Sequence, residues 1–174
     1  LSFMKGGRWD LEKNNPSQNT LPSMNHDKSK KRIIEASQQL YLKQLNITDQ
    51  NGHVYKSAQD KYKQINHYIE ILSTLLKELP NHEVIQVVDM GCGKGYLTFA
   101  IYDYLNHILK RPSRVVGVEL RKDLVDLCNQ IAHDSAYTGL QFKQGSIEAF
   151  DIPEINVLIA LHACDTATDD AIAK

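Results

Sequence analysis

Three glycines follow an acidic residue in the middle of the chain, and this pattern suits the binding of a small ligand through backbone groups. The acid is Asp89, and the glycines stand at positions 91, 93 and 95. Alternate glycines let the backbone turn sharply and approach a ligand without side chains in the way. Residues 84–89 are mostly branched and apolar, which predicts a buried strand, and residues 96–109 predict a helix. The loop should therefore present free backbone N–H groups at a helix N-terminus.

Three kinds of nucleotide-like ligand use such a loop, and the neighbouring residues separate them. A phosphate-binding P-loop needs a Ser or Thr after its Gly-Lys pair, whereas Gly95 follows Gly93-Lys94 here. A dinucleotide fingerprint has the spacing G-x-G-x-x-G and binds an anionic pyrophosphate, which Asp89 would repel. The same carboxylate suits a cationic ligand that carries an ammonium and a sulfonium, and S-adenosylmethionine (SAM) fits that description.

A second acid, Glu119, ends the next predicted strand, residues 114–119. In a βαβ unit the tip of the second strand lies beside the first glycine turn, so a carboxylate there can accept both hydroxyls of a ribose. The alternative is a surface residue or the N-cap of the following helix, predicted for residues 122–136.

Several segments resemble one family of enzymes. Residues 89–95, Asp-Met-Gly-Cys-Gly-Lys-Gly, resemble motif I of class I SAM-dependent methyltransferases. Residues 60–72, 91–105 and 161–174 are similar to a little-characterised family with the signature LHACDTATD. The resemblance covers residues 25–174 and implies an α/β, Rossmann-like fold whose strands begin in the order 3-2-1-4, preceded by N-terminal helices. It also implies SAM as the cofactor and transfer of the sulfonium methyl group to an acceptor.

The resemblance and the strand-end positions together give a set of expected cofactor contacts. Two of them, Gln64 in the "QIN" segment and Lys61 just before it, lie near the start of a long predicted helix, residues 57–79. Ser146 stands where the family resemblance leads us to expect Asp, so the backbone N–H of the next residue becomes the candidate adenine contact. The expected cofactor-binding residues are Lys61, Gln64, Asp89, Gly91, Cys92, Gly93, Lys94, Glu119, Ile147 and Leu161.

Candidate catalytic residues follow the fourth predicted strand, residues 156–161. Ligands of open α/β sheets bind at the carboxyl ends of the strands, so His162 and Asp165 should face the transferred methyl group. His162 is a general base or a residue that positions the backbone, and Asp165 holds the acceptor or caps the next helix. Cys164 is a less favoured nucleophile, and Cys92, His162 and Cys164 are too few, without a paired motif, to predict a zinc site.

A basic cluster precedes an apolar pattern that predicts an amphipathic helix over residues 30–45, with Asp27 or Ser29 as its N-cap. The cluster is Lys28, Lys30, Lys31 and Arg32. It is either a solvated helix face or a contact to RNA phosphates. RNA is therefore the leading acceptor, and a protein or a small molecule stays open.

Composition and length limit the classes of protein to which the chain can belong. The chain has 174 residues, 42% of them hydrophobic, and a net charge of −1, which excludes strong overall attraction to nucleic acid. Its three cysteines are far apart, which fits a reducing cytoplasm, and no apolar run reaches the roughly 18 residues that span a membrane. A SAM-fold module that binds a partner without catalysis is the alternative function. The presence of Asp89, Gly91, Gly93 and Glu119 favours an enzyme.

The expected domain organisation has two parts. Residues 1–26 predict a linker or the end of a missing upstream region, with a hairpin at residues 1–11. Residues 27–174 predict the N-terminal part of a methyltransferase domain, because only four of the seven strands of that fold can be placed, with residues 140–144 as the third. We expect the chain to be truncated after the fourth strand.

Overall fold

The computed structural model describes residues 2–4, 8–10, 32–80, 84–146 and 155–161. It divides into two units, residues 1–31 and residues 32–174. In the first unit, β1 (Ser2–Met4) and β2 (Arg8–Asp10) pair in antiparallel fashion, which confirms the hairpin predicted near the N-terminus.

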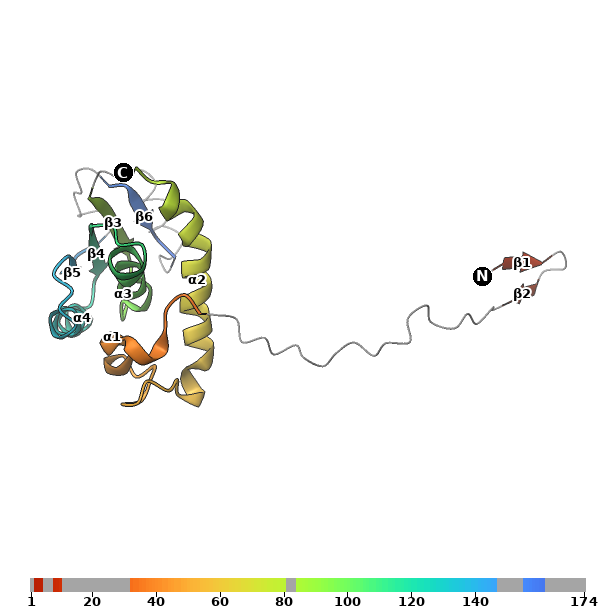
Figure 1. Ribbon diagram of the computed structural model, residues 1–174, viewed down its shortest axis with the longest axis horizontal. Helices are drawn as coiled ribbons and strands as arrows, with labels where there is room; N and C mark the ends of the chain where they lie inside the picture. The colour runs from red at the N-terminus through yellow and green to blue at the C-terminus, as the bar shows by residue number, and fades with distance from the viewer. Residues whose placement is uncertain (1, 5–7, 11–31, 81–83, 147–154, 162–174) are drawn as a thin grey trace. The chain divides into compact units, whose positions relative to one another are not determined.

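A four-stranded parallel sheet forms the centre of the second unit (Figure 1). Its strands are β3 (Ile85–Met90), β4 (Ser113–Glu119), β5 (Leu140–Gln144) and β6 (Val157–Ile159). They lie in the order β5-β4-β3-β6, which confirms the predicted order 3-2-1-4. The fourth strand is shorter than the predicted 156–161, because only residues 157–159 pair with β3.

Three helical segments that flank this sheet follow the predicted ranges closely. A 3₁₀ turn, η2 (Lys56–Ala58), leads into α2 (Gln59–Glu78), whose apolar residues recur at helical spacing and bury Ile65, Ile69 and Leu76. Helix α3 (Tyr96–Asp103) packs against α2 and continues as a π-helical segment, η3 (Tyr104–Ile108). Helix α4 (Lys122–Asp134) packs against β4 and β5.

The helix predicted over residues 30–45 is wrong over residues 32–35, which are not helical, and residues 30 and 31 lie outside the described residues. In the described part of that range, only η1 (Ala36–Gln38), a 3₁₀ turn, and the short α1 (Leu40–Gln44) are helical, and the two N-cap candidates lie outside the described residues. The reason is that two side chains of α2 form hydrogen bonds with the backbone of the fully buried Ile34. The backbone N–H of Ile34 donates to Asn66 Oδ1 at 3.0 Å, and its carbonyl oxygen accepts from the Tyr62 hydroxyl at 2.6 Å. These side-chain bonds replace the helical ones, so the segment around Ile34 is not helical.

Aromatic rings pack beneath the loop that joins β3 to α3. The rings of Tyr41 and Phe99 stack with centroids 5.3 Å apart, and Phe142 lies 5.1 Å from Phe99. A Cβ added to Gly117 would lie 2.5 Å from the Phe142 ring, and one added to Gly95 would lie 2.7 Å from it. The absence of side chains at these two glycines therefore lets the loop and β4 close onto the Phe142 ring.

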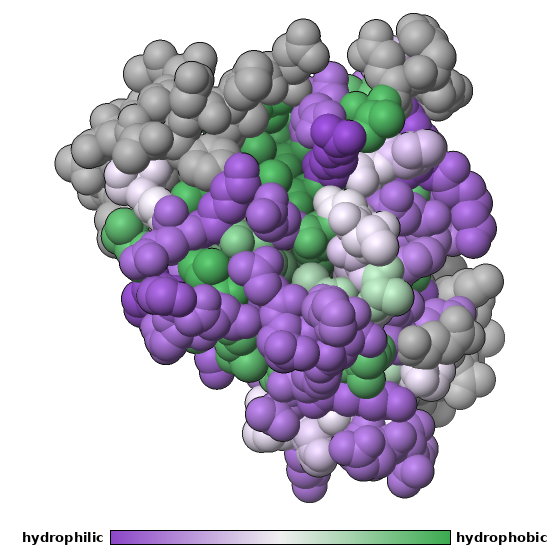
Figure 2. All heavy atoms as spheres, turned by 90° about the vertical axis from the view of Figure 1, so that its left-hand side faces the viewer, coloured by the Kyte–Doolittle hydropathy of each residue, from purple (hydrophilic) through white to green (hydrophobic). Residues whose placement is uncertain are grey.

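The side that carries β5 and α4 is mostly hydrophilic, as Figure 2 shows. The exposed residues of β5 are Gln141, Lys143 and Gln144. A charged side chain such as that of Lys143 on an edge strand disfavours pairing with another chain. Among the described residues, no helix is both long and apolar enough to cross a membrane.

Candidate cofactor site

The loop after β3 has the left-handed turns that its glycines predict. Gly91, Gly93 and Gly95 have φ values of 67°, 57° and 68°, a backbone conformation that other residues rarely adopt. The N–H of Cys92 donates to the carbonyl of Val118 at 3.1 Å, which attaches the loop to the end of β4. The loop thus lies at the carboxyl ends of β3 and β4, where open α/β sheets bind ligands.

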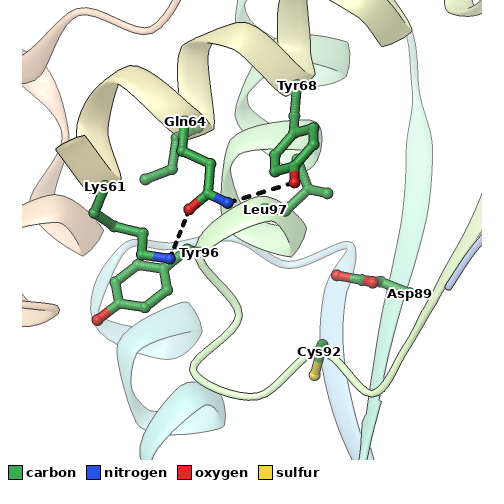
Figure 3. Close-up of a pocket in the computed structure, with 8 residues that line it drawn as sticks. Lys61, Gln64, Tyr68, Asp89, Cys92, Tyr96 and Leu97 are labelled. Atoms are coloured by element: carbon green, nitrogen blue, oxygen red, sulfur yellow. Dashed lines mark hydrogen bonds between the residues drawn. The ribbon is translucent and has the colours of Figure 1, made fainter. Parts of the chain in front are cut away.

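A pocket that is partly open to solvent lies between this loop and α2 (Figure 3). Its lining residues come from α2, the end of β3, the glycine loop and the start of α3. They are Lys61, Gln64, Ile65, Tyr68, Asp89, Cys92, Tyr96 and Leu97. Four residues expected from the sequence to bind a cofactor (Lys61, Gln64, Asp89 and Cys92) therefore share one cavity.

One wall of the pocket carries a cation held in place by its neighbours. Lys61 Nζ donates to Gln64 Oε1 at 2.7 Å and lies 5.5 Å from the centre of the Tyr96 ring, within cation–π range. Gln64 Nε2 donates in turn to the Tyr68 hydroxyl at 3.4 Å. Tyr68 and Tyr96 were not among the residues expected from the sequence. Tyr68 could have been found from its position four residues after Gln64, which places both on one face of a helix.

The opposite wall carries the Asp89 carboxyl group, as Figure 3 shows. Asp89 is only 5% exposed, and Thr98 Oγ1 donates to its Oδ2 at 2.6 Å. Burial raises the pKa of Asp89 to about 6, although the hydrogen bond from Thr98 opposes this shift. A cation and a buried carboxyl group thus face one pocket, an arrangement that complements a zwitterionic amino-acid group.

Glu119 ends β4 beside the glycine loop, as predicted, and binds that loop directly. Its Oε2 accepts the N–H of Gly93 at 2.9 Å, and its Oε1 accepts from the backbone N and the Nε of Arg121 at 3.1 and 3.0 Å. Burial disfavours ionisation of this carboxyl group, but the hydrogen bonds from Arg121 and Gly93 outweigh it and lower its pKa. Glu119 is therefore an ionised acceptor at neutral pH.

The two described cysteines are buried thiols near the loop. Burial, followed by the nearby Asp89 carboxyl, raises the pKa of Cys92 far above its ordinary value. Burial also raises the pKa of Cys128 to about 12, and this residue belongs to the core, as its helical spacing predicted. Such thiols are poor nucleophiles and poor metal ligands. Within the described ranges, no group of three or more His, Cys, Asp or Glu side chains could hold a metal ion.

Other expected site residues lie away from the pocket or outside the described part of the chain. Lys94 is exposed and does not line the pocket, and Leu161 is 49% exposed beyond the end of β6. Ile147, His162 and Asp165 lie outside the described residues, as does Cys164. Their expected roles stay predictions.

The order of the parallel strands, the glycine loop after β3 and the acid that ends β4 define a Rossmann-like class I methyltransferase fold. The family model described as a methyltransferase domain matches residues 60–174. The chain belongs to this methyltransferase domain family.

Comparison with solved structures found methyltransferases, and the first of the three below agrees with this fold. Magnesium protoporphyrin IX methyltransferase from Synechocystis PCC 6803, determined with bound SAH, is 16% identical, with a TM-score of 0.52 over 70% of this chain and 54% of that one. A TehB-like SAM-dependent methyltransferase from Corynebacterium glutamicum is 15% identical, with a TM-score of 0.41, over 68% of this chain and 65% of that one. PKMT2 from Rickettsia typhi, in complex with AdoHcy, is 21% identical, with a TM-score of 0.43, over 52% of this chain and 18% of that one.

The chain spans less than two thirds of the length of each of these three proteins. A search of curated proteins found no match.

Proposed function

We propose that this chain binds SAM in the pocket between α2 and the glycine loop, as part of an enzyme that transfers the sulfonium methyl group. One observation carries the proposal: Lys61 and Asp89 occupy opposite walls of one pocket, directly beside the loop. The methionine end of SAM has a carboxylate that suits Lys61 and an ammonium that suits Asp89. Its ribose suits Glu119, which lies beside the same loop.

Neighbouring side chains hold the charged groups of the pocket in place. Lys61 is oriented by Gln64 and the Tyr96 ring, so little side-chain freedom is lost when a carboxylate arrives. Asp89 is desolvated, so a bound ammonium gains more from its charge than it would in water. Bound SAM supplies an electrophilic methyl group for in-line displacement by an acceptor lone pair. The chain's contribution to that step is to orient the two reactants, which can be worth about 7 to 11 kcal/mol.

The catalytic assignments rest on sequence position alone. We propose that His162 takes a proton from the acceptor, where the acceptor atom carries one, or positions the backbone around the cofactor. We propose that Asp165 holds the acceptor or caps the helix that follows it.

We propose RNA as the acceptor. The basic cluster Lys28, Lys30, Lys31 and Arg32 supports this proposal. Arg32 lies two residues before Ile34, whose backbone is held by hydrogen bonds from α2. Changing the four residues to neutral ones should weaken RNA binding and flatten its salt dependence while SAM affinity stays constant. Equal RNA binding by the parent and the neutral variant at low and high salt would contradict RNA as the acceptor.

The cofactor site is tested by calorimetric titration with SAM. Lys61→Ala should weaken binding about tenfold or more, because a charge-assisted hydrogen bond to the carboxylate is lost. Lys63→Ala is the matched control, since Lys63 lies on the same helix but pairs with the exposed Asp60 and does not line the pocket. Equal affinity of the two variants would contradict the proposed pose.

Catalysis is tested separately. Radiolabelled methyl transfer from SAM to fractions of a cell extract distinguishes RNA, protein and small-molecule acceptors. Binding of SAM without transfer to any fraction would favour the non-catalytic binding module.

A further inference from the structure

The Glu119 carboxylate is already nearly saturated with hydrogen-bond donors. It accepts three hydrogen bonds, two on Oε1 from Arg121 and one on Oε2 from Gly93. A carboxylate offers about four lone-pair positions. Two ribose hydroxyls would raise the number of donors to five, so one present donor must leave when a ribose binds.

Only one of these donors is free to move. The N–H groups of Gly93 and Arg121 belong to the backbone at the glycine loop and after β4. The Arg121 side chain, in contrast, is 64% exposed, and breaking an exposed ion pair costs little. Its guanidinium also reaches toward the loop, because Nη2 lies 3.9 Å from the position that a Cβ of Gly93 would occupy.

We infer that the Arg121 side chain is an internal competitor for the ribose site, which must swing away from Glu119 before a ribose can be held through both hydroxyls. This inference rests on the proposed function. It makes Arg121 a positioning residue that lowers the affinity of the site for any ribose-bearing ligand and orients the Glu119 carboxylate.

The experiment compares the full chain with its Arg121→Ala variant by calorimetric titration with S-adenosylhomocysteine, which lacks the sulfonium charge. The variant should bind about two- to fivefold more tightly, and this gain should shrink at high salt, which screens an exposed ion pair. Arg121→Lys keeps a cation beside Glu119 and should return the affinity toward that of the parent. The same ligand without its two ribose hydroxyls does not need Glu119, so it should bind both proteins equally.

Lys122→Ala is the matched control, because Lys122 is 68% exposed and pairs with Asp126 rather than with Glu119. It should leave the affinity unchanged. The inference is overturned if Arg121→Ala binds S-adenosylhomocysteine no more tightly than the parent does. It is also overturned if Lys122→Ala shows the same gain in affinity, or if Arg121→Ala shows that gain with the ligand that lacks the ribose hydroxyls. A parent chain that does not bind S-adenosylhomocysteine at all overturns the proposed function itself, and the inference with it.

Discussion

Asp89→Asn should stabilise the ligand-free protein while it weakens cofactor binding. Burial raises the pKa of Asp89 from 3.8 to about 6, so the ionised carboxylate opposes folding above that pH. The shift corresponds to at most about 3 kcal/mol at neutral pH. Asn removes the charge and can still accept the hydrogen bond that Thr98 donates to Asp89. For a domain of this size, that free energy can raise the melting temperature by up to about 10 °C.

The difference in stability between the mutant and the parent should depend on pH. Below the pKa of the unfolded chain the carboxyl is protonated in both states, so parent and mutant should differ little near pH 3. The advantage of the mutant should grow between about pH 4 and pH 6 and stay constant above. Thermal unfolding across this range measures it, and added SAM should stabilise the parent more than the mutant. A mutant that melts below the parent at pH 8, or an advantage that does not change with pH, would refute the reasoning.

Two further predictions concern the scaffold of the site. Gly117→Ala should destabilise the protein by about 1 to 3 kcal/mol, because the new methyl group meets the Phe142 ring. Adding Phe142→Leu should recover part of this loss. If thermal melts show that the double mutant loses as much stability as the two single mutants together, the reasoning is contradicted. Tyr62→Phe should cost about 1 to 3 kcal/mol in chemical denaturation, because the buried carbonyl of Ile34 loses its donor, whereas Tyr55→Phe, at an exposed position, should cost much less.

The sequence predicted the sheet and its two acids well, because both follow from local patterns. A branched apolar run, an acid and alternate glycines constrain the path of the chain over residues 84–96 with no need of distant contacts. Strand order then follows from the resemblance to a known fold. Asp89 and Glu119 stand at strand ends, so their places beside the loop could be predicted with the strands themselves.

Features that depend on contacts between distant segments could not be predicted. The apolar spacing of residues 33–41 suits a helix, but Tyr62 and Asn66 on α2 hold Ile34 in a segment that is not helical. Gly117 gave no signal in the sequence, because its constraint is the Phe142 ring on the next strand. The hydrogen bonds between Arg121 and Glu119 likewise depend on side-chain orientation rather than on spacing.

The affinity for SAM as a function of pH tests the central claim most directly, because it asks whether the ligand binds and whether Asp89 receives its positive charge. Calorimetric titration of the parent chain should show saturable one-to-one binding. The affinity should be constant above about pH 6.5 and fall about tenfold per pH unit below about pH 6, as the carboxyl becomes protonated. Absence of saturable binding at pH 7.5, or an affinity that stays unchanged down to pH 5, would contradict the account.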